Sequence, residues 1–211
     1  DVEKYAINKG MEGGIPDHNF SPKAGDVKYR DLNGDYKIDD KDVAAIGYPK
    51  YPLLTGNMSL GFSWNGLDFS MVWSGAFKTS RLVSSFYRVP FDTTNNRALL
   101  SYMIKDAWTP EKGDSSTAPA ISFGASKANN YKDSDLWLRD ASYVRLKNIE
   151  LGYSFPKQIV KKMHLGTLRL SVSGYNLLTF DDMGFCDPES NPDGQAYPLI
   201  KVVNFGLKVG F

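Results

Sequence analysis

Residues 202–211, Val202-Val-Asn-Phe-Gly-Leu-Lys-Val-Gly-Phe211, decide the fold. Successive side chains of a strand point to opposite faces, so this stretch has one apolar face and one small or polar face. In a transmembrane barrel the apolar face contacts lipid, and about ten tilted residues cross the hydrocarbon layer. The stretch therefore predicts a membrane-crossing strand. Its apolar residues are Val203, Phe205, Leu207, Val209 and Phe211, and the sequence stops on that face.

Composition and charge exclude several classes of function. The chain has 211 residues, 42% of them hydrophobic, and a formal net charge of +1. That balance provides no overall basic field for nucleic acid or anionic lipid, so we expect no nucleic-acid partner. Cys186 is the only cysteine, which excludes an internal disulfide and a cysteine metal cluster. No apolar run is long enough for a membrane-spanning helix or a signal peptide, but the alternation of barrel strands escapes that search.

Asn65-Gly66 predicts a tight hairpin, because both residues accept the positive φ that a two-residue turn requires. Apolar residues alternate with small or polar ones on both sides of the turn, as in two antiparallel strands. The apolar face consists of Met58, Leu60, Phe62 and Trp64 before the turn and Leu67, Phe69, Met71 and Trp73 after it.

The same alternation predicts two further strands, at residues 143–155 and 168–173. The segment between the hairpin and these strands contains one helical piece, in which Leu99, Met103 and Ala107 share a face. Asn95 or Asn96 is its predicted cap, and Pro110 ends it.

The connections alternate in length, as they do in outer-membrane barrels with short periplasmic turns and long extracellular loops. Five strands cannot close a barrel, so we expect an all-β fragment: antiparallel strands of a large transmembrane β-barrel with long extracellular loops. Aromatic residues near the strand ends fit the headgroup level, although they could also close a sandwich core. The predicted segments are an extracellular loop (1–54), a barrel hairpin (55–77), a long extracellular loop with a short helix (78–141) and the last three strands with their connections (142–211).

Several blocks of the sequence resemble the C-terminal part of the SusC/RagA-type TonB-linked outer-membrane transporters. The resemblance implies a large barrel with an N-terminal plug, in the outer membrane of a Gram-negative bacterium. It implies import of an oligosaccharide or a peptide, a SusD-like surface lipoprotein as a lid, and energy from the TonB system through a preceding part of the protein. The blocks are Gly25-Asp-Val-Lys-Tyr-Arg-Asp-Leu-Asn-Gly-Asp35, Trp108-Thr-Pro-Glu111, Trp137-Leu-Arg-Asp-Ala-Ser-Tyr-Val-Arg-Leu-Lys-Asn-Ile-Glu-Leu-Gly-Tyr153, Ser173-Gly-Tyr-Asn-Leu-Leu-Thr179, Asp187-Pro-Glu189, Tyr197-Pro198 and the terminal strand.

In that family the terminal aromatic strand also resembles the signal that the outer-membrane assembly machinery binds. The resemblance therefore implies a second role for Phe205, Leu207, Val209 and Phe211, beside contact with lipid.

Residues 31–42 have the spacing of an EF-hand loop, with oxygen ligands expected at positions 1, 3, 5, 7, 9 and 12. Calcium, or magnesium as the alternative, is the predicted cation. Tyr36 departs from the pattern because it replaces the glycine at the sharp turn, and Asp42 replaces a longer glutamate. A solvated turn without a metal is the alternative. The predicted ligands are Asp31, Asn33, Asp35, the backbone carbonyl of Lys37, Asp39 and Asp42.

Aromatic residues in the longest predicted outer loop are candidates for contact with substrate or with the lid. They are Phe86, Tyr87, Trp108 and Tyr131, and packing of the loop on itself is the alternative explanation. No catalytic set is visible, because His18 and His164 have no nucleophile at a recognisable spacing, and we expect no enzyme. The remaining alternative is a soluble β-sandwich module that binds calcium and a glycan.

Overall fold

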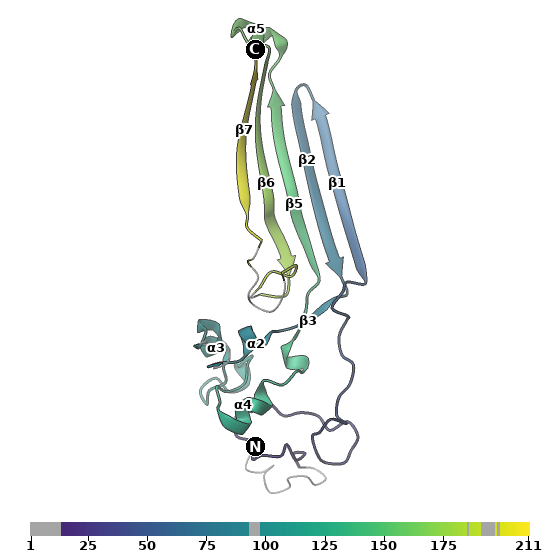
Figure 1. Cartoon of the computed structure of the whole chain (residues 1–211), viewed down its shortest axis with the longest axis vertical. Coiled ribbons are helices and arrows are strands. Elements are labelled where there is room, and N and C mark those ends of the chain that lie inside the picture. The colour runs from purple at the N-terminus through teal and green to yellow at the C-terminus, as the bar shows by residue number, and fades with distance from the viewer. Residues whose placement is uncertain (1–13, 93–97, 185, 191–196, 198) are drawn as a thin grey trace. The chain divides into compact units, whose positions relative to one another are not determined.

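The computed structural model describes residues 14–92, 98–184, 186–190, 197 and 199–211. Its main feature is a single five-stranded sheet in the order β1-β2-β5-β6-β7 (Figure 1). Every neighbouring pair is antiparallel, which confirms the predicted antiparallel strands. β1 and β7 form the two edges of the sheet. The strands span Leu54–Trp64 (β1), Leu67–Phe77 (β2), Tyr143–Ser154 (β5), Thr167–Asp181 (β6) and Val202–Gly210 (β7).

The predicted hairpin at Asn65-Gly66 is confirmed. Both residues have positive φ, 49° and 84°, and Trp64 pairs with Leu67 across the turn. A Cβ atom on Gly66 would lie 2.4 Å from the carbonyl oxygen of Ser154 on β5. Glycine is therefore required twice here, by the backbone conformation and by the close approach of the neighbouring strand.

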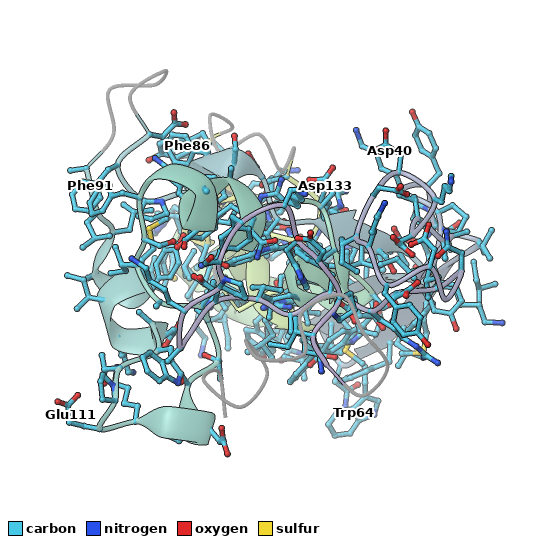
Figure 2. The ribbon with its side chains drawn as sticks, turned by 90° about the horizontal axis from the view of Figure 1, so that it is seen from below. Asp40, Trp64, Phe86, Phe91, Glu111 and Asp133 are labelled. Carbon is cyan, nitrogen blue, oxygen red and sulfur yellow. The ribbon has the colours of Figure 1, made fainter. Side chains whose placement is uncertain are left out.

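One face of the sheet is an uncovered apolar stripe that crosses all five strands. Among the described residues, neither a second sheet nor a helical layer packs on it. Figure 2 shows the Trp64 ring extending away from the ribbon, and 70% of its surface is exposed. Phe205 is 85% exposed. A soluble sandwich would cover these rings with a facing sheet, whereas a lipid-facing barrel wall leaves them open.

The opposite face carries serine, glycine and charged residues. Near the short-turn end of the sheet, Arg169 of β6 forms ion pairs with Asp68 of β2 and Glu150 of β5. Gly152 leaves room for this cluster, since a Cβ atom there would lie 2.3 Å from the Arg169 guanidinium. Polar residues on this face suit the interior of a large barrel.

β6 is longer than the predicted strand at 168–173, because an irregularity interrupts its alternation. The pairing of β5 with β6 shifts between Leu146 and Asn148, and Asn176 on β6 has a positive φ of 53°. Beyond this bulge, Leu178 and Phe180 return to the apolar face opposite Leu146 and Val144. A bulge adds a residue to one strand without ending the sheet, and simple alternation does not reveal it.

The chain divides into two compact units, 1–46 with 82–138 and 47–81 with 139–211, of which the second contains the five-stranded sheet. The first unit therefore combines parts of both long predicted loops. Its helix α3 begins at Ser101, with no side-chain cap, and it contains Met103 of the predicted helical face. The predicted caps Asn95 and Asn96 lie outside the described residues. The remaining elements are α2 (Ser85–Arg88), α3 (Ser101–Asp106), η1 (Gly113–Ser115), α4 (Gly124–Asn130), η2 (Asp135–Trp137), α5 (Lys157–Lys162) and the paired short strands β3 (Ser80–Leu82) and β4 (Leu138–Asp140).

None of the helices in the described residues has the length and the apolar character that a membrane crossing requires.

Candidate functional site

The acidic loop at residues 31–42 is held together by its own carboxylates. Asp31 accepts hydrogen bonds from the backbone N–H groups of Gly34 and Tyr36, each at 2.7 Å. Asp42 closes the loop by accepting from Leu32 at 2.8 Å and Asp39 at 2.9 Å. These backbone N–H groups of Asp39 and Leu32 lower the pKa of the Asp42 carboxyl. The loop is thus a folded turn whose first and last carboxylates bind opposite parts of its backbone.

The first and last carboxylates of this loop bind the loop's own backbone. In the part of the chain that the structure describes, no group of three or more His, Cys, Asp or Glu side chains could hold a metal ion. Tyr36 adopts the left-handed φ of 62° that glycine has at this position of an EF-hand loop. Asp40, labelled in Figure 2, is exposed and is not one of the predicted ligands. Tyr36 therefore has the backbone conformation of that position, and calcium binding by this loop stays a prediction.

Trp108 lies in a shallow groove of about 370 Å³ and packs closely on Gly25. A Cβ atom on Gly25 would lie 2.5 Å from Cε3 of Trp108, and Gly25 has a positive φ of 88°. The groove is also lined by Asp26, Asp114 and Thr117, so it has carboxylate and hydroxyl groups as well as the indole. Trp108 is half-buried, which makes it part of the packing of this unit as well as a candidate contact residue.

The other three aromatic candidates are also half-buried. Phe86 and Tyr87 lie on α2 with their ring centroids 5.0 Å apart, edge to face. Tyr131 packs on Trp137 at 5.6 Å, and its burial raises the pKa of the phenol to about 12, with a smaller effect of the Asp26 charge. No ligand contact of these residues is established by this packing, and their role as substrate or lid contacts stays a prediction.

A buried pair of asparagines, which sequence reasoning missed, holds the first of the resembling blocks in place. The Asn130 side chain is fully buried and accepts a hydrogen bond from the Val27 N–H at 2.9 Å while it donates to Asp26 at 2.9 Å. The Asn129 side chain donates to the Val27 carbonyl at 2.9 Å, and the backbone carbonyl of Asn129 accepts from the Tyr29 hydroxyl at 2.8 Å. Satisfied buried amides fix one arrangement of the backbone that they bind. The block from Gly25 onward is therefore a structural element of this unit.

A second missed cluster joins β5 to the connection between β6 and β7. Arg145 is buried and pairs with Asp187 at 2.8 Å and Glu189 at 3.0 Å. Lys147 contacts Glu189 at 2.8 Å, and the Tyr143 hydroxyl donates to the same carboxylate at 2.5 Å. Partial burial opposes ionisation of Glu189, but Lys147, Tyr143 and Arg145 outweigh it and lower the pKa of that carboxyl. The signal in the sequence was an arginine and a lysine close together on the polar face of a predicted strand.

His18 has a structural role. Its Nε2 accepts a hydrogen bond from the Tyr29 N–H at 3.1 Å, so Nδ1 carries the proton and donates to the Pro16 carbonyl at 2.7 Å. Burial is the main cause that lowers the pKa of this imidazole. His164 is exposed in the turn after α5.

The terminal strand β7 lies at the edge of the sheet with its apolar side chains on the uncovered face. Phe205 pairs with Val172 and Leu207 with Leu170, while Val209 pairs with Leu168. Phe211 follows the strand and is fully exposed. Binding of these four side chains by the assembly machinery stays a prediction.

Comparisons with known proteins place this geometry in context. No family model matches the chain. It is 27% identical over 202 residues to TonB-dependent receptor P3 of Formosa agariphila, covering 87% of this chain and 19% of that protein. It is 26% identical over 184 residues to TonB-dependent receptor SusC of Bacteroides thetaiotaomicron, covering 86% of this chain and 17% of that protein.

The fold matches a solved structure of the RagAB peptide importer in the open-open state, with a TM-score of 0.63 and 21% identity over 87% of this chain and 20% of that chain. The chain thus spans about a fifth of the length of the relatives that it matches. These findings confirm the predicted resemblance and fold class: the chain is similar in sequence to SusC-type TonB-dependent receptors, and its fold is that of the C-terminal strands of a large transmembrane β-barrel of the SusC/RagA type.

Proposed function

We propose that this chain forms the C-terminal part of the barrel wall of a TonB-dependent outer-membrane importer of nutrient oligomers in a Gram-negative bacterium. One observation carries the proposal: an apolar stripe crosses five antiparallel strands and remains uncovered in the described part of the chain. Exposure of such rings to water would be costly, whereas exposure to acyl chains is favourable. The wall would need further strands to close.

The names of the relatives and the predicted resemblance support the proposed partners. The similar proteins are named TonB-dependent receptors, and the similar structure is a peptide importer, RagAB. We propose that a SusD-like lipoprotein covers the outer side and that the TonB system drives transport through the rest of the protein. Whether the cargo is a peptide or an oligosaccharide depends on residues that we expect largely outside this chain.

Loops at the ends of long strands supply the contact surface in this proposal. Trp108 with Asp26 and Asp114 offers an aromatic face beside polar groups, a combination that suits either a sugar ring or a peptide. Calcium in the acidic loop at residues 31–42 would stiffen the same unit, and the left-handed Tyr36 backbone supports that part of the proposal.

Neighbouring residues on β7 provide a matched test of the barrel wall. Phe205 lies on the apolar stripe, and Asn204 lies on the opposite face beside Ser173. In the full transporter, Phe205→Arg should cost about 2 to 4 kcal/mol of barrel stability and reduce the amount in the outer membrane, since arginine would face lipid. Asn204→Arg should be tolerated in the interior. Equal loss in both variants, or none in either, would contradict a lipid-facing stripe.

The transport part is tested separately in cells. Uptake of a labelled oligopeptide and of a labelled oligosaccharide is measured with the transporter present, and again after removal of TonB. One of the two labelled compounds should accumulate in cells that have both the transporter and TonB, and not in cells that lack TonB. Outer-membrane insertion without TonB-dependent uptake of either class would leave the barrel assignment intact and overturn the importer.

A further inference from the structure

The apolar stripe contains a shallow groove of about 440 Å³ near the short-turn end of the sheet. Two cross-strand rows of outward side chains form its walls, and the backbone of a row of small inward residues forms its floor. The floor is low because Gly152, Ser171 and Gly206 raise no side chain on this face. The wall residues are Leu67, Tyr153, Leu170 and Leu207 in one row and Leu151, Val172 and Phe205 in the next.

The connection between β5 and β6 places a short basic helix at the end of the same strands. In α5, Val160 is 2% exposed and anchors the helix, while Lys157, Lys161 and Lys162 are exposed. Figure 1 shows α5 at the same end of the sheet as the C-terminus. The backbone N–H of Gly166 donates to Gly210 at 2.6 Å, which ties this connection to the last strand.

Charge and apolar surface are separated on α5 in a way that suits a membrane interface. Ile159 and Met163 are one helical turn apart and are both about half exposed. Lys157 and Lys161 are also one turn apart, on the other side of Val160. Lysines at such an edge extend their ammonium groups to the headgroups while their methylene chains remain on apolar surface. The net charge of +1 provides no overall basic field, so any attraction of an anion here is local.

We propose that this groove and α5 together bind one anionic glycerophospholipid of the periplasmic leaflet, a proposal that rests on the barrel function above. An acyl chain lies in the groove between the two rows, and the phosphate group is held by the lysines of α5. The spacing fits this arrangement, because Leu170 lies three residues into β6, about 10 Å from the strand end next to α5. The groove continues the lipid-facing stripe, so its occupant reaches it within the bilayer.

The headgroup part is tested with the full transporter, stripped of lipid in detergent, by native mass spectrometry. Phosphatidylglycerol, phosphatidylcholine with the same chains, and glycerol 3-phosphate are titrated separately. Phosphatidylglycerol should bind more than about tenfold tighter than phosphatidylcholine, since each lysine near an anionic lipid contributes up to about fivefold. The triple variant Lys157→Gln, Lys161→Gln, Lys162→Gln should lose this preference. The matched control changes three exposed lysines of the first unit outside residues 31–42, in Lys23→Gln, Lys105→Gln, Lys132→Gln, and should keep this preference.

The groove part is tested by placing a large ring at an outward wall residue, so that the ring fills the groove. Val172→Trp should weaken binding of both phospholipids at least about fivefold because the ring occupies the floor between the rows. Met58→Trp, on the same stripe in β1 but outside the groove, should leave both affinities unchanged.

Each other outcome is decisive. Equal affinity for the two phospholipids, unaffected by the lysine changes, overturns the headgroup site. Binding of glycerol 3-phosphate as tight as that of phosphatidylglycerol overturns the lipid in favour of a soluble phosphate. Every variant must also be folded, which is shown by a band of altered mobility when the sample is run unheated on a detergent gel. Absence of that band in the unaltered transporter would instead count against the barrel function itself.

Discussion

The guanidinium group of Arg145 on β5 lies 2.8 Å from Oδ2 of Asp187, in the connection between β6 and β7. The arginine side chain is 1% exposed and the carboxylate 13% exposed, so both charges are largely removed from water. Glu189 completes the cluster at 3.0 Å from the same guanidinium. This ion cluster fixes residues of a long connection on the polar face of β5.

Arg145→Met should destabilise this connection strongly, because Asp187 and Glu189 would remain partly buried without their shared counter-charge. We expect about 2 to 3 kcal/mol, below the value for fully buried pairs because both carboxylates retain some exposure. The measurement is the rate of protease cleavage in the β6–β7 connection. A second readout is the temperature at which the folded band is lost on a detergent gel.

Arg169→Met is the matched control, since Arg169 also pairs with two carboxylates but all three side chains are more exposed. Its cost should be much smaller than that of Arg145→Met, because solvent screens exposed ion pairs. Equal cleavage rates in the two variants would contradict the role assigned to burial.

Gly25→Ala should disrupt the unit that contains Trp108. The new methyl group would meet the indole at 2.5 Å, and a side chain at φ 88° is strained in any case. The two effects together should cost about 2 to 4 kcal/mol. Gly34→Ala is the control, because Gly34 has φ 79° with no atom within 4 Å of the added carbon, so only about 1 kcal/mol of backbone strain applies. Hydrogen exchange in α4 compares the two, and similar protection in both variants would rule out the steric contact.

Calcium should bind weakly to residues 31–42, with a dissociation constant of about 10⁻⁴ to 10⁻³ M. Isothermal titration of the transporter should show heat that Asp35→Ala removes and Asp40→Ala retains, because Asp35 is at a ligand position and Asp40 is not. Absence of heat, or the same heat in the Asp35 variant, would leave the loop as a solvated turn.

Acidification should loosen the segment around Tyr29 through His18. Burial favours the neutral imidazole, so its pKa in the folded state is lower than 6.5. The stabilisation is therefore complete above about pH 6.5 and is lost as the pH falls through the lower, folded-state value. Protonation would also remove the acceptor for the Tyr29 N–H. Hydrogen exchange at Tyr29, corrected for intrinsic rates, should show falling protection below pH 6.5.

His18→Gln provides the comparison, since an amide can donate and accept without titrating in this range. Its protection at Tyr29 should be almost independent of pH between 5 and 7. A pH dependence equal to that of the unaltered protein would assign the effect to another group.

The strands were predictable because their signal is local. Alternation and the Asn65-Gly66 turn depend on neighbours in sequence, and both appear in the structure as expected. The packing of the first unit was not predictable in this way, because the Val27 N–H and the Asn130 side chain are 103 residues apart in the chain. The bulge near Lys147 was also missed, since the register shift depends on the partner strand.

Among the candidate sites, Tyr36 departs from the EF-hand pattern in sequence, yet its backbone has the left-handed φ of that position. Sequence spacing also did not reveal that the carboxylates bind the loop's own N–H groups. It identified Trp108 and Tyr131 as aromatic residues of a long loop, but it could not foresee their partners Gly25 and Trp137, because those contacts depend on tertiary packing.

The edge strands β1 and β7 have a practical consequence. Each offers a row of main-chain donors and acceptors to any extended segment that approaches, and β1 is exposed along its whole length. Produced by itself in water, the polypeptide should therefore associate edge to edge into ladder-like polymers. The apolar faces of successive copies should pack against one another. Co-expression with a polypeptide that supplies the adjoining strands should suppress this polymerisation.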